Sequence, residues 1–327
     1  MWLSAAVLLA AAIVAPPVGG QKVDAFMGDW EGTLSLGGTE SSRIAAQVIA
    51  RGKGRYRANL LPEFDRRVEP LAVLEGRDVD GAVEFDPAGN DTKWSGRLDG
   101  VEFSGRVEGA QRGSFSLKPV VRLSPTLGRK PPPGAVVLLD GSGTDGWVHA
   151  GNGQPCKWKL LEDGALEVVP RTGSIVSKRQ FRDHHLHIEF RGPFMPAARG
   201  QKRGNSGVYL QGFYEVQVLD SYGLEGRDNE CGGIYKVAAP LVNMCAPPMQ
   251  WQTYDIDFTA PRFDKTGRMT AHALMTVVHN GVEIHDNLEV PRPTAAHGAG
   301  DLAQPGGLYL QDHGNRVQYR NIWVVEE

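Results

Sequence analysis

The sequence is short of the features that mark several large classes of protein. Beyond its first twenty residues it has no apolar run long enough to cross a bilayer. With 35 basic and 38 acidic residues, it has too little excess charge to predict a nucleic acid or an anionic membrane as partner. Apolar residues at helical spacing are almost absent, which excludes a mainly helical fold. Glycine (41) and proline (21) are plentiful, and they suit many short strands joined by turns.

Cysteine is scarce as well, with Cys156, Cys231 and Cys245 in the whole chain. Their spacing matches no zinc-binding pattern. In an oxidising compartment Cys231 and Cys245 can pair and leave Cys156 free. The alternative is three separate buried thiols.

Residues 1–20 form an apolar run that ends in prolines and small residues. We interpret the run as a signal peptide, although no Lys or Arg precedes it. The alternative is a membrane anchor, but about 14 apolar residues fall short of the roughly 20 that a spanning helix needs. No cysteine follows for lipid attachment. We therefore expect a periplasmic or secreted protein.

Residues 26–123 predict a small all-β domain, either a barrel or a sandwich, because strand-like segments recur with glycine-rich turns between them. No carboxylate pair or histidine cluster gathers there, so an accessory binding or packing role is expected. Residues 124–134 contain three successive prolines and are interpreted as a stiff linker. The expected strands are Thr33–Leu36, Ile44–Arg51, Arg55–Leu61, Val68–Leu74, Ala82–Asp86, Lys93–Leu98, Val101–Val107 and Ser114–Val121.

Residues 135–327 predict a second all-β domain, a two-sheet jelly-roll sandwich with one concave face. Asn280-Gly281 is a two-residue hairpin turn. The expected strands include Val136–Asp140, His184–Phe190, Gly233–Lys236, Trp251–Phe258, Met269–His279, Val282–Asn287, Gly306–Asp312 and Val317–Val325.

One expected strand, His184–Phe190, places His185, His187 and Glu189 on the same face. Two histidines and a glutamate in a row are candidate metal ligands. However, neighbours on one face of a strand lie about 6.6 Å apart and project in parallel, so they do not converge on one ion. A polar outer face of a sheet is the preferred interpretation.

The stretch Arg203–Asp220 predicts two strands joined at Gln211-Gly212. Glu215 and Gln217 share one face of the second strand, and apolar residues alternate with them. A carboxylate and an amide need a polar environment, which is either bulk solvent or a substrate groove.

Separated motifs in the second domain occur in the order found in one family. They are Leu138-Leu-Asp-Gly141, Gly204-Asn-Ser-Gly-Val-Tyr-Leu-Gln211, Tyr214-Glu-Val-Gln-Val-Leu-Asp220, Cys231-Gly-Gly-Ile-Tyr235, Trp251-Gln-Thr-Tyr-Asp255 and Gly307-Leu-Tyr-Leu-Gln-Asp-His-Gly314. Residues 135–325 thus resemble the 3-keto-disaccharide hydrolase domain, a concanavalin-like sandwich related to laminarinases and lichenases. The resemblance implies a periplasmic or secreted enzyme that cleaves glycosides of 3-keto sugars. It also implies a flavin or nicotinamide sugar 3-dehydrogenase that supplies them.

The catalytic pattern of the laminarinase relatives is altered in this chain. Their Glu-x-Asp-x-x-Glu strand reads Glu215-x-Gln217-x-x-Asp220, which does not suit ordinary double displacement. A 3-keto group acidifies the hydrogen on C2, so elimination of the aglycone followed by water addition at C1 needs one base and one oxyanion donor. Glu215 is the expected base, with Asp220 or His313 as the acid.

The expected substrate-binding residues surround that strand. Arg203, Asn205 and Gln217 are candidates to hold the keto oxygen and the hydroxyls, and Tyr209 and Tyr235 are candidates to stack on the sugar. Asp312 and His313 can line the rim of the groove, and the alternative for them is a turn in which Asp312 bonds its own backbone.

The sequence fixes no cofactor. Asp312, Glu215 and the histidines could hold a divalent ion, but no spacing identifies one. The competing functions are a non-catalytic carbohydrate-binding protein with the same fold and an ordinary glycosidase acting on β-glucans.

Overall fold

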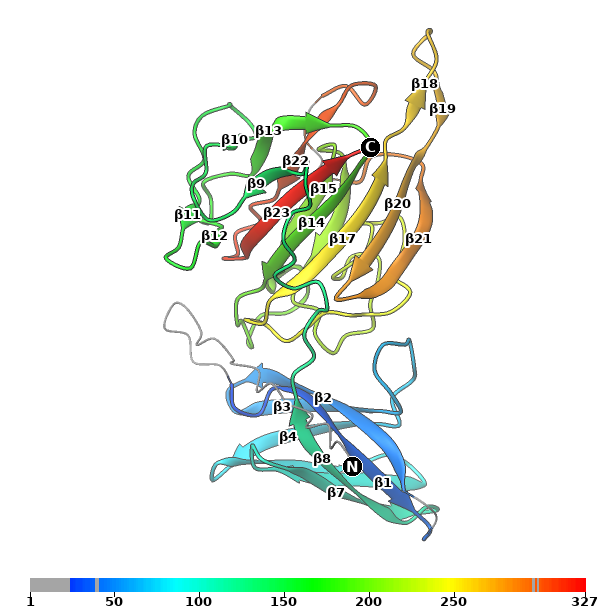
Figure 1. Cartoon of the computed structure of the whole chain (residues 1–327). Coiled ribbons are helices and arrows are strands. Elements are labelled where there is room, and N and C mark those ends of the chain that lie inside the picture. The colour runs from blue at the N-terminus through cyan, green and yellow to red at the C-terminus, as the bar shows by residue number, and fades with distance from the viewer. Residues whose placement is uncertain (1–23, 39–40, 296–297, 299) are drawn as a thin grey trace, which may run out of the picture.

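The computed structural model describes residues 24–38, 41–295, 298 and 300–327. In that part of the chain almost every regular element is a strand, as expected for an all-β protein, and the one exception is a single turn of 3-10 helix, η1 (Gly200–Lys202). No described helix is long and apolar enough to span a membrane. The expected signal peptide lies outside the described residues. Figure 1 shows a barrel at one end of the molecule and a larger sandwich at the other.

The first part of the chain is a closed barrel in which eight strands follow one another and β1 pairs with β8. Its interior is filled by apolar and aromatic side chains, among them Trp30, Phe103 and Phe115. Of the two architectures expected, the barrel is the one found. The strands are β1 (Gly28–Leu36), β2 (Ser42–Gly52), β3 (Arg55–Leu61), β4 (Ala72–Val79), β5 (Ala82–Ala88), β6 (Thr92–Leu98), β7 (Phe103–Gly109) and β8 (Gly113–Val120).

The second part of the chain is a sandwich of two antiparallel sheets. The smaller sheet has the order β10-β13-β22-β15-β16. Its strands are β10 (Trp147–His149), β13 (Ile175–Phe181), β22 (Gly306–Leu310), β15 (Ser206–Leu210) and β16 (Tyr214–Val218).

The larger sheet has the order β11-β12-β23-β14-β17-β20-β21, with β9 paired to β23. A short ribbon of β18 and β19 extends beyond it. The strands are β9 (Val136–Leu139), β11 (Lys159–Leu160), β12 (Leu166–Glu167), β14 (His184–Arg191), β17 (Gln252–Thr259), β18 (Arg262–Phe263), β19 (Met269–Ala271), β20 (Ala273–His279), β21 (Val282–Val290) and β23 (Gln318–Glu326).

Several expected strands differ from the structure. β1 begins at Gly28 rather than at Thr33, and the strand expected at Met269–His279 is divided into β19 and β20. The segment expected at Val68–Leu74 is shifted, because β4 begins at Ala72 and continues through charged residues to Val79. Gly233–Lys236 makes only isolated bridges from Ile234 to Val216 and Ala238. A tight turn replaces the strand there, since a Cβ on Gly233 would lie 2.6 Å from the carbonyl oxygen of Asp228.

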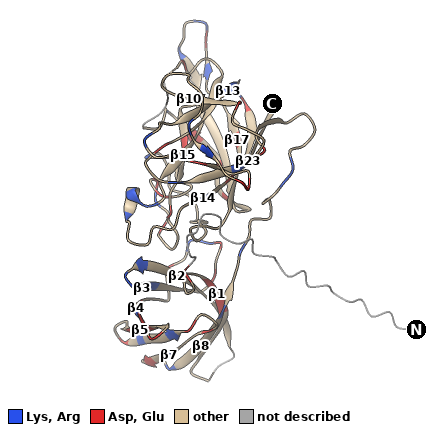
Figure 2. Ribbon diagram, turned by 90° about the vertical axis from the view of Figure 1, so that its left-hand side faces the viewer, with Lys and Arg blue, Asp and Glu red and all other residues tan. Residues whose placement is uncertain are grey.

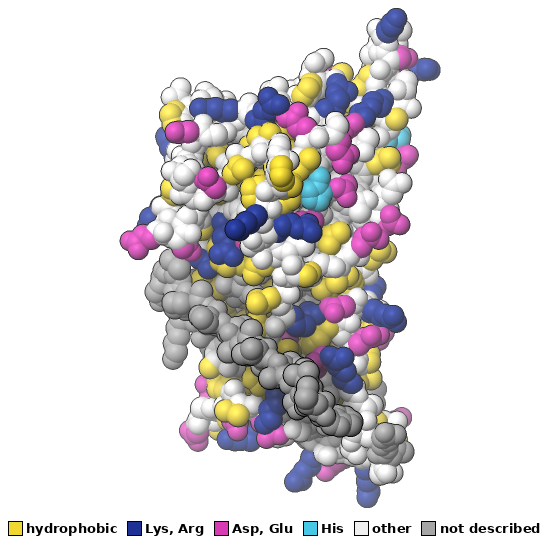
Figure 3. Space-filling view, in the orientation of Figure 1, with side chains coloured by type: hydrophobic (Ala, Val, Ile, Leu, Met, Phe, Trp, Pro, Cys, Tyr) yellow, Lys and Arg dark blue, Asp and Glu magenta, His cyan; other side chains and the backbone are white. Residues whose placement is uncertain are grey.

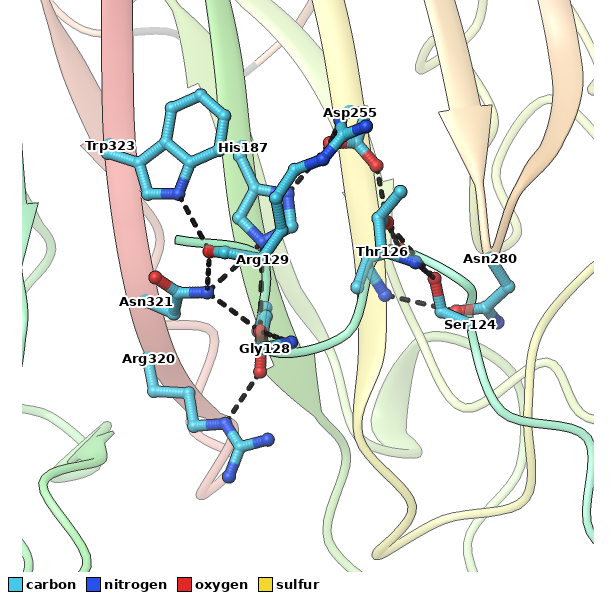
Figure 4. A network of polar contacts seen from close by, with 12 residues as sticks. Ser124, Thr126, Gly128, Arg129, His187, Asp255, Asn280, Arg320, Asn321 and Trp323 are labelled. Carbon is cyan, nitrogen blue, oxygen red and sulfur yellow. Dashed lines mark hydrogen bonds and ion pairs between the residues drawn. The ribbon is translucent and has the colours of Figure 1, made fainter. Parts of the chain in front are cut away.

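The outer face of β14 is polar, as preferred from the sequence, but it is not solvated. His187 and Glu189 are fully buried beneath the segment that joins the two domains (Figure 4). Burial disfavours ionisation, yet hydrogen bonds from His187 and Asn321 and the charge of Arg320 lower the pKa of Glu189 to about 2.

The segment between the domains is therefore anchored and does not act as a free spacer. Its Gly128 amide donates to Glu189 (2.5 Å), Thr126 Oγ1 donates to Asp255 (2.6 Å), and Asn321 donates to the Arg129 carbonyl (2.9 Å). Among the described residues no group of three or more His, Cys, Asp or Glu side chains is arranged to hold a metal ion.

All three cysteines are free thiols in the structure. Cys156 is half-buried, whereas Cys231 and Cys245 are buried and their side chains are hydrogen-bonded to each other. Cys231 Sγ also contacts Tyr254 Oη at 3.2 Å, directly behind the strand that carries Glu215.

Acidic and basic residues occur on both domains in Figure 2, and both signs occur on the face of the molecule drawn in Figure 3.

Candidate functional site

The outer face of the smaller sheet carries a row of functional side chains. Tyr214, Val216 and Val218 point into the core between the sheets, so the alternate residues of β16 point outward. The register pairs Glu215 with Tyr209 on β15, and Tyr209 with Tyr309 on β22. Three neighbouring strands thus place a carboxylate and two phenols side by side.

Glu215 is the most perturbed carboxyl group of this row. It is 2% exposed, which rules out the bulk-solvent environment left open by the sequence. Burial raises the pKa of Glu215 to about 8, although a hydrogen bond from Tyr209 opposes the rise. In the described part of the chain Glu215 has no salt-bridge partner. A buried carboxyl group with a pKa near neutrality is suited to proton transfer.

Gly207 leaves the space that the Glu215 carboxyl group occupies. Gly207 is on β15, opposite Gln217 on β16. A Cβ on Gly207 would come within 2.4 Å of Glu215 Oε1 and 2.7 Å of Tyr209 Cε2. Any side chain at this position would displace the carboxyl group from Tyr209.

Replacing Gly207 with alanine tests this packing. We expect Gly207→Ala to lower turnover of the 3-keto glycosides expected from the sequence by roughly tenfold to a hundredfold, because the carboxyl group of Glu215 must move by about 1 Å. Circular dichroism should remain that of a folded all-β protein. Turnover equal to that of the wild type would show that the carboxyl position is not critical.

Three side chains, two on the segment that leads into β15 and one on β16, have buried polar atoms without a partner among the described residues. They are Arg203 Nη2, Asn205 Oδ1 and Gln217 Oε1. Leaving such atoms unpaired is costly, and so native structures rarely do it without a functional reason. One donor and two acceptors of this kind suit a ligand rich in carbonyl and hydroxyl groups.

Gln201, on η1, holds two of these residues in place. Its carbonyl oxygen and Oε1 both accept hydrogen bonds from Asn205 Nδ2, at 2.8 and 3.0 Å. The same Oε1 accepts a longer one from Gln217 Nε2 at 3.5 Å. The free amide oxygens of Asn205 and Gln217 are thereby fixed in direction.

Asp220, a candidate proton donor from the sequence, lies against Arg203 in the structure. Its Oδ2 lies 3.2 Å from Arg203 Nε, and its backbone carbonyl accepts from the same nitrogen at 2.8 Å. Burial raises the pKa of Asp220, and the charge of Arg203 opposes that rise. The side chain and the backbone carbonyl of Asp220 therefore both orient Arg203.

At the turn after β22, Asp312 stabilises the backbone and His313 is exposed to solvent. Asp312 Oδ1 accepts from the Gly314 amide (2.9 Å) and Oδ2 from the Gly173 amide (3.0 Å), so the turn interpretation of Asp312 is the one found. His313 is exposed at this turn. Tyr235 is half-buried beside β16, and its amide donates to the Glu215 carbonyl at 3.4 Å.

A cavity of about 860 Å³ borders the Arg203 end of the site. Asn315 lines it and accepts a hydrogen bond from the Asn205 amide at 2.8 Å. Gly192 also lines it, and a Cβ added at Gly192 would lie 4.0 Å from Asp220 Cβ. The cavity has room for a small molecule and touches the site through Asn315 and Gly192.

A family profile matches most of the sandwich. The profile of the 3-keto-alpha-glucoside-1,2-lyase-like domain covers residues 134–325. The chain belongs to this family. The lyase-like domain of this protein is therefore the sandwich that carries Glu215, and the barrel lies outside the match.

Solved structures add one informative neighbour. A Parabacteroides distasonis protein assigned as a glycosyl hydrolase is 36% identical, with a TM-score of 0.56 over 61% of this chain and 86% of its own. A second protein with the same assignment and organism is 18% identical, with a TM-score of 0.44 over 59% of this chain and 94% of its own. No curated protein matches the chain. The family and the first neighbour make this a carbohydrate-active, glycosyl hydrolase-like protein.

Sequence reasoning missed two residues of the lyase-like site. Tyr309 is half-exposed and packs edge-on against Tyr209, with ring centres 5.0 Å apart. Gln201 precedes the predicted strands and belongs to no motif. The sequence does contain a signal for Tyr309. Tyr209-Leu-Gln211 and Tyr309-Leu-Gln311 repeat the same three residues, and the structure places them on adjacent strands.

Proposed function

We propose that the protein cleaves glycosides whose sugar carries a 3-keto group, by eliminating the aglycone across C1 and C2. The observation that carries the proposal is the buried Glu215 carboxyl group, which has a hydrogen bond from Tyr209 but no salt-bridge partner among the described residues and a pKa of about 8. Support comes also from the family, whose description names a lyase acting on 3-keto-α-glucosides. A sugar without the keto group has no acidic hydrogen at C2 for such a base to remove.

The reaction needs one base and one oxyanion donor. Glu215 as carboxylate takes the C2 proton, and the electron pair of that C–H bond passes to the keto oxygen as an enolate. Arg203 Nη2, which is buried and has no partner, donates to this oxygen. Collapse of the enolate forms the C1–C2 double bond and expels the aglycone oxygen.

The leaving oxygen takes up one proton to become an alcohol. We assign this proton to the carboxyl group that Glu215 has just formed, and His313 at the exposed turn is the second candidate donor. Asp220 is not assigned this role, because Arg203 engages it. Water then adds to the double bond, with hydroxide at C1 and a proton at C2, and completes a net hydrolysis. We assign the aglycone to the cavity that Asn315 lines, since Asn315 accepts a hydrogen bond from the Asn205 amide.

Ordinary double displacement is a poor fit to the same geometry. It requires two carboxyl groups about 5 to 5.5 Å apart, with the nucleophile ionised. Here Asp220 is paired with Arg203, and Glu215 is largely protonated at pH 7. A glycosidase acting on plain β-glucans is therefore disfavoured.

A non-catalytic sugar-binding protein is the second candidate, because Glu215 is almost completely covered in the structure. Incubation with matched plain and 3-keto glucosides, with products detected by mass, separates the candidates. We expect cleavage of the keto sugars alone. Binding without cleavage would indicate the sugar-binding protein, and reducing sugar from laminarin would indicate the ordinary glycosidase.

The pH dependence of the reaction follows from the state of Glu215. A base must be deprotonated, so kcat/KM should rise about tenfold per unit at low pH and level off above about pH 8. The measurement is an initial-rate profile from pH 5 to 10 with a 3-keto glucoside. A plateau reached by pH 6 would show that the essential base is not this carboxyl group.

The setting of the reaction is also part of the proposal. A sugar 3-dehydrogenase is proposed to supply the keto glycoside by oxidising the 3-hydroxyl group. The enzyme is proposed to act in the periplasm or medium, on the support of the apolar segment at residues 1–20.

A further inference from the structure

The barrel touches the two chain segments that meet at Arg203. One segment, residues 193–203, leads into β15, and the other, residues 219–223, leaves β16. Arg203 and Asp220 join them, because the Asp220 amide also donates to the Arg203 carbonyl at 3.0 Å. Whatever fixes both segments fixes the free Nη2 of Arg203.

The barrel holds the first segment by packing and by one hydrogen bond. Phe194 packs on the apolar interior of the barrel. Ala197 lies against Gly52, where an added Cβ would come within 3.3 Å of the Ala197 Cα. Arg199 Nη2 donates to the Arg51 carbonyl at 2.8 Å.

The barrel holds the second segment more tightly, through buried polar groups. Tyr222 Oη donates to Asp29 Oδ1 at 2.7 Å, and Tyr222 is fully buried. Asn59 Nδ2 donates to the Gly223 carbonyl at 2.8 Å. Ile49 packs on Gly223, whose φ of +69° and lack of a side chain allow the approach, since a Cβ would lie 2.5 Å from Ile49 Cδ1.

A continuous chain of contacts runs from the barrel to the site. Asp29 on β1 accepts from Tyr222, the Tyr222 amide donates to Asp220 Oδ1 at 3.3 Å, and Asp220 Oδ2 pairs with Arg203. Asp29 is 5% exposed, and its other oxygen accepts from Arg122 Nε at 2.8 Å. Among these side chains, Arg203 alone has a buried polar atom without a hydrogen-bond partner, its Nη2 at the far end.

We propose that the barrel is a positioning element of the catalytic site, and that Asp29 and Tyr222 are positioning residues that aim Arg203 at the substrate. The inference rests on the proposed function for its kinetic consequences, but its structural claim stands independently. It assigns a role to a domain that lies outside the family match. The barrel is then a part of the enzyme and not a separate binding module.

Tyr222→Phe in the full-length protein is the smallest change that tests this series of contacts, because only the hydroxyl group that binds Asp29 is lost. Asp29→Asn is the second variant and keeps the size of the side chain. The matched control is Arg67→Met, which removes hydrogen bonds from the same barrel to the carbonyls of Gly226 and Pro240 (2.7 and 2.8 Å) without touching Asp220. The kinetic probe is the 3-keto derivative of 4-nitrophenyl α-glucoside.

We expect Tyr222→Phe to lower kcat roughly threefold to tenfold and to leave KM within about twofold of the wild type, because a misaimed Arg203 stabilises the developing enolate less well. The midpoint of the pH profile should stay where Glu215 sets it. The value of kcat is expressed per folded molecule, with the folded fraction taken from chemical denaturation, so a variant that was merely less folded would keep the wild-type value. Arg67→Met should change this kcat by less than about twofold. Equal kcat per folded molecule in Tyr222→Phe and the wild type would overturn the proposal.

Hydrogen exchange separates this proposal from the proposed function. In Tyr222→Phe the Asp220 amide and the amides of residues 203–206 should exchange at least about fivefold faster, whereas those of β20 should not change. Faster exchange in a protein that cleaves no keto glucoside would remove the proposed function and leave the positioning role. Unchanged exchange would overturn the positioning role whatever the activity.

Discussion

Glu215→Gln is expected to lower kcat on a 3-keto glucoside by at least about a thousandfold, because the amide cannot take the C2 proton. The substitution keeps the size of the side chain and an acceptor for the Tyr209 hydroxyl group, so KM should change little. The measurement is release of 4-nitrophenol from the 3-keto α-glucoside. Turnover within tenfold of the wild type would remove Glu215 from the mechanism.

The stability of the same variant provides its control. Glu215 has a pKa of 4.5 in the unfolded chain and about 8 in the folded one, so folding binds a proton between these values. Its contribution to stability is fully present below pH 4.5 and is lost as the pH rises through 8. Each unit in this window costs the wild type about 1.4 kcal/mol.

Glu215→Gln should therefore match the wild type in stability at pH 4 and exceed it by roughly 4 kcal/mol at pH 8. Chemical denaturation at the two pH values measures the difference. A variant that is inactive and more stable at pH 8 has lost a functional group rather than its fold. Equal stability at both pH values would mean that the pKa of Glu215 is not raised.

Arg203→Met has the second largest expected effect. It removes the charge that faces Asp220 in a site where both side chains are at most 5% exposed. Breaking a buried ion pair on one side typically costs about 3 to 5 kcal/mol, because the remaining charge is left without a partner. We expect that loss of unfolding free energy at pH 7, with a smaller loss at pH 4, where Asp220 becomes protonated.

The binding consequence of Arg203→Met is separable from its cost in stability. Arg203→Met/Asp220→Leu removes both charges and should recover most of the unfolding free energy. It should not recover turnover, because the donor to the keto oxygen is still missing. Recovery of both stability and turnover in the double variant would show that Arg203 serves the fold alone.

The fold was largely readable because strand patterns are local. The alternation of Glu215 and Gln217 with Tyr214 and Val216 predicts which side chains enter the core, and the burial of Tyr214 and Val216 in the core of the sandwich confirms it. The predicted end of β4 was wrong because Glu75-Gly-Arg-Asp78 lacks apolar alternation. That strand pairs with two neighbours in a closed barrel, and this pairing is long-range information.

The site was less readable because its environment comes from distant segments. Nothing near Glu215 in the sequence indicates that it would be buried and its pKa raised. The spacing of Glu215, Gln217 and Asp220 predicted Asp220 as a proton donor. Only the fold brings Asp220 against Arg203, seventeen residues away along the chain. The contact of Asp29 with Tyr222 joins residues 193 positions apart, beyond the reach of any local pattern.

Removal of the C2 proton is the central claim, and solvent deuterium tests it most directly. The enzyme is incubated with a 3-keto α-glucoside in D₂O, and the released sugar is analysed by mass and NMR at early times, with Glu215→Gln plus free 3-keto glucose as the control for spontaneous exchange. Elimination followed by water addition predicts one deuterium at C2 of every product molecule. Product that retains hydrogen at C2 would contradict the account, because the glycosidic bond would then have been broken without the enolate.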